Sequence, residues 1–172
     1  EVSSRSGGQT FLGRIVSTCR AAGVERVLVV VGHHREATEG AARDVSDRVV
    51  FNDDPDRGMG SSVRLGVRAI PGDAQSVLLW PVDSPGPTVA TVTALLDEAD
   101  RHPKSVVIPT DGSGGQGHPV VLPGTLLAAI ASMDPSARLD HLIESSGTTT
   151  RLVATEDPTV CLDVDTPSDY EG

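Results

Sequence analysis

The sequence predicts an α/β fold in which helices cover a mostly parallel β-sheet. Segments with apolar residues at helical spacing alternate with short, Val-rich apolar runs along the 172 residues, and this alternation is typical of parallel sheets flanked by helices. The chain has only two Phe, one Trp and one Tyr, so its core must be built from aliphatic side chains. We expect one domain over residues 1–172, because this length is ordinary for a single core.

The first helix and the first strand come early in the chain. Over Thr10–Ala22 the apolar residues recur at helical spacing, Thr10 is suited to cap the helix, and Gly23 follows its end. The continuous apolar run Val27–Val31, closed by Gly32, predicts a strand that is buried on both faces. A helix followed by a buried strand is half of a βαβ unit.

The later elements keep this rhythm up to residue 108. The patterns predict helices at residues 34–43, 61–70 and 87–99 and strands at residues 48–51, 76–80 and 105–108. A Gly-rich turn then follows at Asp111–Gly117, and His118–Leu122 is predicted to return as a hairpin partner. The last patterns predict helices at residues 124–132 and 137–144 and strands at residues 151–155 and 160–164.

The charge balance excludes several classes of partner. With 14 basic and 24 acidic residues the net charge is -10, so we expect no binding to nucleic acid or to an anionic membrane, which both need clustered cations. No apolar run approaches the ~20 residues of a membrane span, and residues 1–10 lack the apolar core of a signal peptide. We therefore expect a cytoplasmic protein. Cys19 and Cys161 are too few for a disulfide framework and are expected to be small buried hydrophobes.

Small and polar residues follow the strand that ends at Phe51. Ligands in open parallel sheets bind beyond the carboxyl ends of the strands, and here the sequence continues with Asn52 and a Gly-rich turn into a helix. The residues of this turn are Gly58, Met59, Gly60, Ser61 and Ser62. Free backbone N–H groups and two hydroxyls at a helix start could bind an anion; alternatively, the turn is an ordinary Ser N-cap.

Acidic residues follow two other predicted strands. Asp83 lies in Pro81–Pro85 (P-V-D-S-P), where two prolines stiffen the turn, and a carboxylate at a strand tip suits Mg²⁺; it could instead only cap or turn the chain. Asp163 and Asp165 alternate along the last predicted strand and so point to one face. Asp83 and Asp165 could share one metal, or Asp165 could cap a helix that starts at Pro167.

His118 lies between Gly117 and Pro119 after the glycine turn. It could bond to a substrate or simply pin the hairpin to a neighbouring carbonyl. Residues 112–117 match G-x-G-x-x-G, but a strand follows where a dinucleotide site needs a helix, so that site is excluded. No zinc-ligand spacing occurs, and V-D-S-P-G around Ser84 lacks the glycines of a hydrolase nucleophile elbow.

Taken in order, these segments resemble the MobA-like NTP transferase family, and within it the molybdenum cofactor cytidylyltransferase branch. The matching stretches are T-F-L-G-R-I-V-S-T-C-R-A-A-G-V-E-R-V-L-V-V-V-G-H at residues 10–33, N-D-D-P-D-R-G-M-G-S-S-V-R-L-G-V at 52–67, P-V-D-S-P at 81–85, G-H-P-V at 117–120 and L-D-V-D-T-P-S-D at 162–169. The resemblance implies a Rossmann-like three-layer sandwich of the nucleotide-diphospho-sugar transferase type.

The resemblance also implies an activity. Such enzymes transfer a nucleoside monophosphate from an NTP to a phosphorylated acceptor with Mg²⁺ and release pyrophosphate; in this branch CMP from CTP goes to molybdopterin, with a molybdoenzyme as a possible downstream partner. Asp83 and Asp165 would then be metal ligands, Asn52 and Gly58–Ser62 would line the nucleotide and acceptor cleft, and His118 would sit on the acceptor side. No side-chain nucleophile is needed, since the acceptor phosphate attacks. The alternatives are a non-catalytic protein that delivers the cofactor and a transferase with another small phosphorylated acceptor.

One family feature does not occur in the sequence. The family begins with a strand and a phosphate-binding loop of the form A-A-G-x-S-x-R-x-G-x-P-K, and Ser3–Gly8 lies too close to Thr10 to be that loop. Either about 20 to 30 residues precede Glu1 in the natural protein, or the chain is a degenerate relative. We expect the former, because a sheet without its central strand would expose unpaired backbone on both neighbouring strands.

Overall fold

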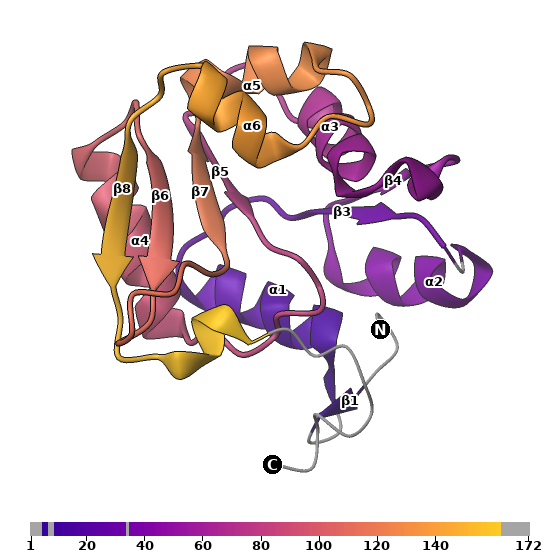
Figure 1. Ribbon diagram of the computed structural model, residues 1–172. Coiled ribbons are helices and arrows are strands. Elements are labelled where there is room, and N and C mark those ends of the chain that lie inside the picture. Colours follow the sequence, from indigo (N-terminus) through magenta and orange to yellow (C-terminus); the bar gives the residue numbers. More distant parts are fainter. Residues whose placement is uncertain (1–4, 7–8, 34, 163–172) are drawn as a thin grey trace.

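The computed structural model of the chain describes residues 5–6, 9–33 and 35–162. Helices and strands alternate through these residues (Figure 1), which confirms the predicted α/β class. The helices are α1 (Phe11–Ala21), α2 (Arg35–Val45), α3 (Met59–Ala69), α4 (Val89–Arg101), α5 (Gly124–Ser132) and α6 (Leu139–Ser145), with 3₁₀ turns η1 (Pro55–Arg57) and η2 (Pro158–Cys161). None of the helices described has the length and apolar character that a membrane span requires.

The strands form one mixed sheet and two smaller pairs. They are β1 (Arg5–Ser6), β2 (Gln9–Thr10), β3 (Leu28–Val31), β4 (Arg48–Phe51), β5 (Ser76–Leu79), β6 (Val106–Thr110), β7 (Val120–Pro123) and β8 (Thr150–Ala154). The four-stranded sheet has the order β5-β7-β6-β8, in which β7 is antiparallel to β5 and β6 while β6 and β8 are parallel. The pair β3–β4 is parallel and the pair β1–β2 antiparallel. The prediction of a mostly parallel sheet is thus wrong for the larger sheet, in which two of the three strand pairs are antiparallel. The reason is that β7, the hairpin partner of β6, also pairs with β5.

Helices cover both faces of the four-stranded sheet. Alternate residues of a strand point to opposite faces, and in β7 Val120 and Leu122 pack with residues of α3 and α5, whereas Val121 packs with residues of α4. Figure 1 shows α5 and α6 on one side of these strands and α4 on the other. The result is the predicted helix, sheet, helix arrangement, with an aliphatic core on each side of the sheet.

The ends of α1 follow the sequence signals closely. The Thr10 hydroxyl accepts the Gly13 N–H at 3.1 Å and caps the helix. Gly23 follows the last turn with φ +92°, in the left-handed region that glycine adopts without strain. Both local predictions are confirmed.

The pair β3–β4 lies apart from the larger sheet. Leu28, Val29 and Val30 are half-buried and only Val31 is buried, although the apolar run predicted burial on both faces. Among the described strands, none bonds to the edge of β3 that faces away from β4. The first strand that the resemblance implies stays a prediction.

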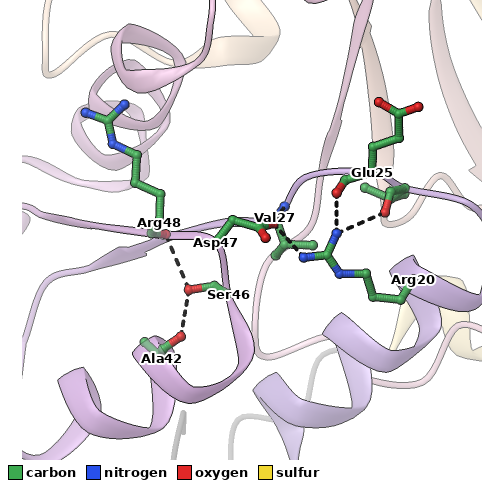
Figure 2. A network of polar contacts seen from close by, with 8 residues as sticks. Arg20, Glu25, Val27, Ala42, Ser46, Asp47 and Arg48 are labelled. Atoms are coloured by element: carbon green, nitrogen blue, oxygen red, sulfur yellow. Dashed lines mark hydrogen bonds and ion pairs between the residues drawn. The ribbon is translucent and has the colours of Figure 1, made fainter.

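A polar network joins α1 and α2 to the start of this pair (Figure 2). Asp47 Oδ2 accepts the Val27 N–H at 2.7 Å and lies 2.5 Å from a guanidinium nitrogen of Arg20. These two bonds hold the pKa of Asp47 below its ordinary value, the Val27 N–H having the larger effect. The Ser46 hydroxyl donates to the Ala42 carbonyl at 2.6 Å at the end of α2. The network fixes the end of the strand pair that lies opposite the predicted site.

The predicted strand at residues 160–164 is wrong for its described part. Residues 158–161 form η2, because the Asp157 carboxylate accepts the Thr159 N–H at 3.0 Å and caps a turn that Pro158 opens. Residues beyond 162 lie outside the described chain. Over the described residues 160–162, a turn capped by Asp157 therefore replaces the predicted strand.

Candidate functional site

Asn52 joins the end of β4 to the first turn of α3. Its side-chain amide donates to the hydroxyls of Ser61 at 2.8 Å and Ser62 at 3.0 Å, and its Oδ1 accepts the Asp54 N–H at 3.1 Å. Asn52 is only 6% exposed and Ser61 only 4%. Both protons of the Asn52 amide are therefore used inside the protein, and its expected place in the cleft stays a prediction. The structure gives it the role of holding the start of α3.

The glycines at the start of α3 serve the turn and its packing. Gly58 has φ +94°, and the Ser61 hydroxyl donates to its carbonyl at 2.8 Å. A Cβ at Gly60 would lie 2.1 Å from the Ala137 carbonyl oxygen, so the loop between α5 and α6 touches the helix start. Met59, in contrast, is 62% exposed. The residues predicted from 58 to 62 thus form one cluster, in which Met59 and the half-buried Ser62 are the more accessible side chains.

Asp83 lies in a tight turn after β5. The Ser84 N–H donates to the Pro81 carbonyl at 3.3 Å, and the indole N–H of Trp80 donates to the Ser84 carbonyl at 2.8 Å. The Oδ1 atom of Asp83 is buried, although the residue as a whole is half-exposed. The turn therefore presents a carboxylate from a rigid backbone, as the two prolines predicted.

The Asp83 turn and the α3 start share one hydrophobic cluster. Val82, the neighbour of Asp83, packs against the same cluster of buried residues as Phe51, the neighbour of Asn52. Val31 at the end of β3 is one of those buried residues. Residues at the ends of β3 and β4 and in the segment after β5 therefore pack into one cluster, and ligands of open parallel sheets bind beyond such strand ends.

His118 is fixed by its backbone. Its N–H donates to the Val160 carbonyl at 2.8 Å, and the Gly117 N–H donates to the Pro109 carbonyl at 3.0 Å. A Cβ at Gly117 would lie 1.9 Å from the Val160 oxygen, so only glycine fits there. The Nδ1 atom of His118 is buried. The backbone of residue 118 thus joins the hairpin to the segment around Val160, and the role of the His118 side chain stays a prediction.

The glycine turn before His118 is organised by Asp111. Its Oδ1 accepts the Ser113 hydroxyl and the Gly115 N–H, both at 2.8 Å. These bonds, that of the Ser113 hydroxyl first, lower the pKa of Asp111. The turn thus uses its own carboxylate to fold.

The segment Asp157–Leu162 contacts both the Asp83 turn and the His118 turn. The Ser84 hydroxyl donates to the Leu162 carbonyl at 3.1 Å, and Asp157 Oδ2 accepts the Thr91 hydroxyl at 2.8 Å. Burial alone would raise the pKa of Asp157, but its bonds from Thr159 and Thr91 outweigh this effect and lower the pKa. Nothing in the sequence points to a role for Asp157, because its partners Thr88 and Thr91 lie far away along the chain.

Arg14 is a second residue that the sequence did not single out. Its guanidinium, which projects from α1, donates to the Gly86 carbonyl at 3.3 Å. A cation therefore lies at the turn that carries Asp83. An exposed arginine on a helix gives no sequence signal for such a contact.

Asp163 and Asp165 lie outside the described residues. Leu162 is the last residue described and is 55% exposed. Within the described part of the chain, no group of three or more His, Cys, Asp or Glu side chains could hold a metal ion.

Cys19 and Cys161 form no disulfide and differ in environment. Cys19 is 6% exposed, and burial raises the pKa of its thiol to about 11. Cys161 is half-buried, and its thiol donates to the Gly115 carbonyl at 3.2 Å. The prediction of a small buried hydrophobe is confirmed for Cys19, whereas Cys161 helps to join η2 to the glycine turn.

Solved structures share this fold over nearly the whole chain. A nucleotidyl transferase from Methanothermobacter thermautotroptrophicus is 26% identical, with a TM-score of 0.81 over 98% of this chain and 81% of that chain. Rv0371c from Mycobacterium tuberculosis, solved as a complex with manganese, is 26% identical, with a TM-score of 0.77 over 96% of this chain and 86% of that chain.

Sequence comparison identifies a shorter match and a family. The bifunctional IPC transferase and DIPP synthase of Rubrobacter xylanophilus is 45% identical over 71 residues, which are 40% of this chain and only 16% of that protein. The model of the MobA-like NTP transferase domain matches residues 3–152. That match covers most of the chain and includes Asn52, Gly58–Ser62, Asp83 and His118. The chain therefore belongs to the MobA-like NTP transferase domain family.

Proposed function

We propose that the protein is a nucleotidyltransferase that transfers a nucleoside monophosphate, CMP from CTP, to a molybdopterin-type cofactor and releases pyrophosphate. The family match supports nucleotidyl transfer. The observation that carries the proposal is the convergence of the Asp83 turn, the α3 start and the His118 turn at one edge of the strands. Val82 and Phe51 join the first two of these, and the segment around Val160 joins the Asp83 turn to the His118 turn.

The residues of the Asp83 turn fit a divalent cation. A buried carboxylate oxygen at a strand end is a hard ligand, and Mg²⁺ in phosphate-transfer enzymes uses one or two carboxylates together with substrate phosphates. A relative was solved with manganese. Asp83 would be the principal ligand and Asp165 the second. When bound, the cation supplies positive charge that neutralises the phosphate oxygens.

The chain's own residues would bind and orient the two phosphate substrates. The first N–H groups of α3, near Met59 and Gly60, have no acceptor within the helix and favour an anion. The accessible hydroxyl of Ser62 adds a donor beside them, and Asn52 holds this helix start in place. His118 would lie on the acceptor side.

The reaction needs no nucleophile from the protein. An oxygen of the acceptor's terminal phosphate attacks the α-phosphorus of the NTP and forms a new P–O bond. The bond from that phosphorus to the bridging oxygen of the β-phosphate breaks, and pyrophosphate leaves with the electron pair. Positioning and charge neutralisation are the main contributions of a protein to such a transfer.

Transfer of label from α-labelled CTP to molybdopterin by the full-length natural protein tests the proposal. We expect transfer with pyrophosphate release in the presence of Mg²⁺, and a loss of at least about 100-fold in Asp83→Asn, because charge stabilisation of this kind is worth that much. Full activity of Asp83→Asn would refute the metal assignment. Molybdopterin binding in calorimetry without any NTP or Mg²⁺ binding would instead identify a delivery protein.

A different small phosphorylated acceptor is the second candidate. It is favoured by the 45% identity over 71 residues to a protein whose name includes IPC transferase. A screen of the four NTPs against several phosphorylated acceptors separates the two candidates, because only one acceptor class should release pyrophosphate.

A further inference from the structure

A single side chain closes the turn that carries Asp83. Trp80 is the first residue after β5, and its indole N–H donates to the Ser84 carbonyl at 2.8 Å. Asp83 lies between these two residues in the chain. The bond therefore ties the end of the strand to the far side of the turn, and the backbone of Asp83 is enclosed between them.

The Ser84 carbonyl that accepts this bond is itself held in place. Ser84 is fully buried, with 0% exposure, and its hydroxyl donates to the Leu162 carbonyl at 3.1 Å. Just beyond it, a Cβ at Gly86 would lie 2.4 Å from the Thr159 Cβ, so the chain packs tightly against η2. The acceptor thus belongs to the buried structure, and a bond to it fixes the turn relative to that structure.

The direction of the Asp83 carboxylate depends on the geometry of this turn. The Oδ1 atom of Asp83 is buried although the residue as a whole is half-exposed, so one oxygen of the carboxylate is held inside the protein. Residues that orient a metal ligand from behind influence the metal affinity of a site although they do not touch the metal. The indole N–H of Trp80 is placed to do this through the backbone of Ser84.

We propose that Trp80 is a positioning residue for the cation that Asp83 binds, a role that rests on the proposed function. The indole has a single N–H and no acceptor atom, and this N–H is used on Ser84. Trp80 therefore acts through the turn and touches neither the cation nor the substrates. With the bond in place, the Asp83 carboxylate needs no further ordering when the cation and the nucleotide bind.

The variant Trp80→Phe tests this role in the full-length protein, because it keeps an aromatic ring and removes the N–H. Binding of the Mn²⁺–CTP complex is measured by water-proton relaxation and binding of CTP without metal by calorimetry, both without an acceptor so that no transfer occurs. We expect the Mn²⁺–CTP affinity to fall by about three- to tenfold, the effect of one hydrogen bond, and the affinity for metal-free CTP to stay the same. A purely structural role would change both affinities or neither.

The matched control is Ser46→Ala. It also removes a side-chain donor to a backbone carbonyl, that of Ala42 at 2.6 Å, but in the network at the opposite end of β3 and β4. Both affinities should stay at their wild-type values in this control. Should Trp80→Phe fail to fold, the analogue β-(3-benzothienyl)alanine is placed at position 80 instead, because it keeps the bicyclic shape and has sulfur where the indole has N–H.

The outcomes separate this proposal from the proposed function. If the wild-type protein binds Mn²⁺ with none of the four NTPs, the proposed function is wrong and the role of Trp80 falls with it. If Asp83→Asn binds Mn²⁺–CTP as tightly as wild type, the cation does not bind at Asp83, and both the metal assignment and the role of Trp80 are refuted. If binding depends on Asp83 and the protein without the indole N–H has wild-type Mn²⁺–CTP affinity, only the role of Trp80 is refuted.

Discussion

The side-chain amide of Asn52 donates to the hydroxyl of Ser61 at 2.8 Å, and this bond joins the end of β4 to the first turn of α3. Because its amide protons and its oxygen are all bonded within the protein, we expect Asn52→Ala to lower the free energy of unfolding by about 1–3 kcal/mol, the cost of leaving buried partners unsatisfied. Urea unfolding measures this change. Gln75→Ala, which alters an exposed amide, is the control and should change stability by less than about 0.5 kcal/mol. An Asn52→Ala protein of unchanged stability that no longer binds NTP would show that Asn52 contacts the nucleotide directly.

Trp80 is expected to report on ligands at Asp83. It is the only tryptophan of the chain, and its indole donates to the Ser84 carbonyl, one residue after Asp83. Addition of Mn²⁺ with nucleotide should therefore quench its fluorescence in a saturable way, since Mn²⁺ is paramagnetic. Asp83→Asn should lose the saturable quenching while its emission without metal stays the same. Equal quenching in both proteins would show that the cation does not bind at Asp83.

Gly117 is expected to tolerate no side chain. A Cβ there would lie 1.9 Å from the Val160 oxygen, so Gly117→Ala must push η2 away or break the Val160 bond to His118. We expect a loss of about 1–3 kcal/mol in the free energy of unfolding, as for other overpacked sites. Gly112→Ala in the same loop has no atom within 4 Å of the added Cβ and serves as the control. Equal unfolding midpoints in urea for the two variants would contradict the close approach.

Asp157 should make the free energy of unfolding depend on pH in the acidic range. Its pKa is lowered from the ordinary value of 3.8 in the folded protein, so its stabilising effect is present above that value and is lost as the pH falls through the folded-state pKa. Asp157→Asn should cost roughly 1–3 kcal/mol at pH 7, towards the lower end because the site is partly open to solvent. The difference between wild type and variant, from urea unfolding between pH 2 and pH 7, should shrink below about pH 4. A difference that is constant with pH would show that the Asp157 charge contributes nothing.

The elements that depend on local signals could be predicted from the sequence. The helix α5 has the predicted bounds, and Thr10 caps α1 as expected, because caps and apolar spacing act over a few residues. Asn52 and Asp83 do follow β4 and β5, as the apolar runs predict, whereas the role of these two segments and of the His118 turn as parts of a site stays a prediction.

What could not be predicted depends on contacts between distant segments. Nothing near β7 indicates that it inserts between β5 and β6. The apolar pattern of η2 resembled a strand, and only the Asp157 cap and the approach of Gly117 show why it turns. The pattern also could not tell that Asn52 holds a helix in place, because a buried amide and a ligand-binding amide look alike in sequence.

The position of β7 has a consequence for how the protein folds. Ser76 of β5 is in register with Pro123 of β7, and Val106 of β6 with Thr150 of β8, so two of the three strand pairs of the larger sheet join segments that lie far apart along the chain. The distant pairings β5–β7 and β6–β8, unlike the hairpin β6–β7, carry a large loop-closure cost and slow the folding rate. During synthesis β5 stays without its neighbour until β7 has left the ribosome, and the apolar edge of β5 is exposed to aggregation during that interval.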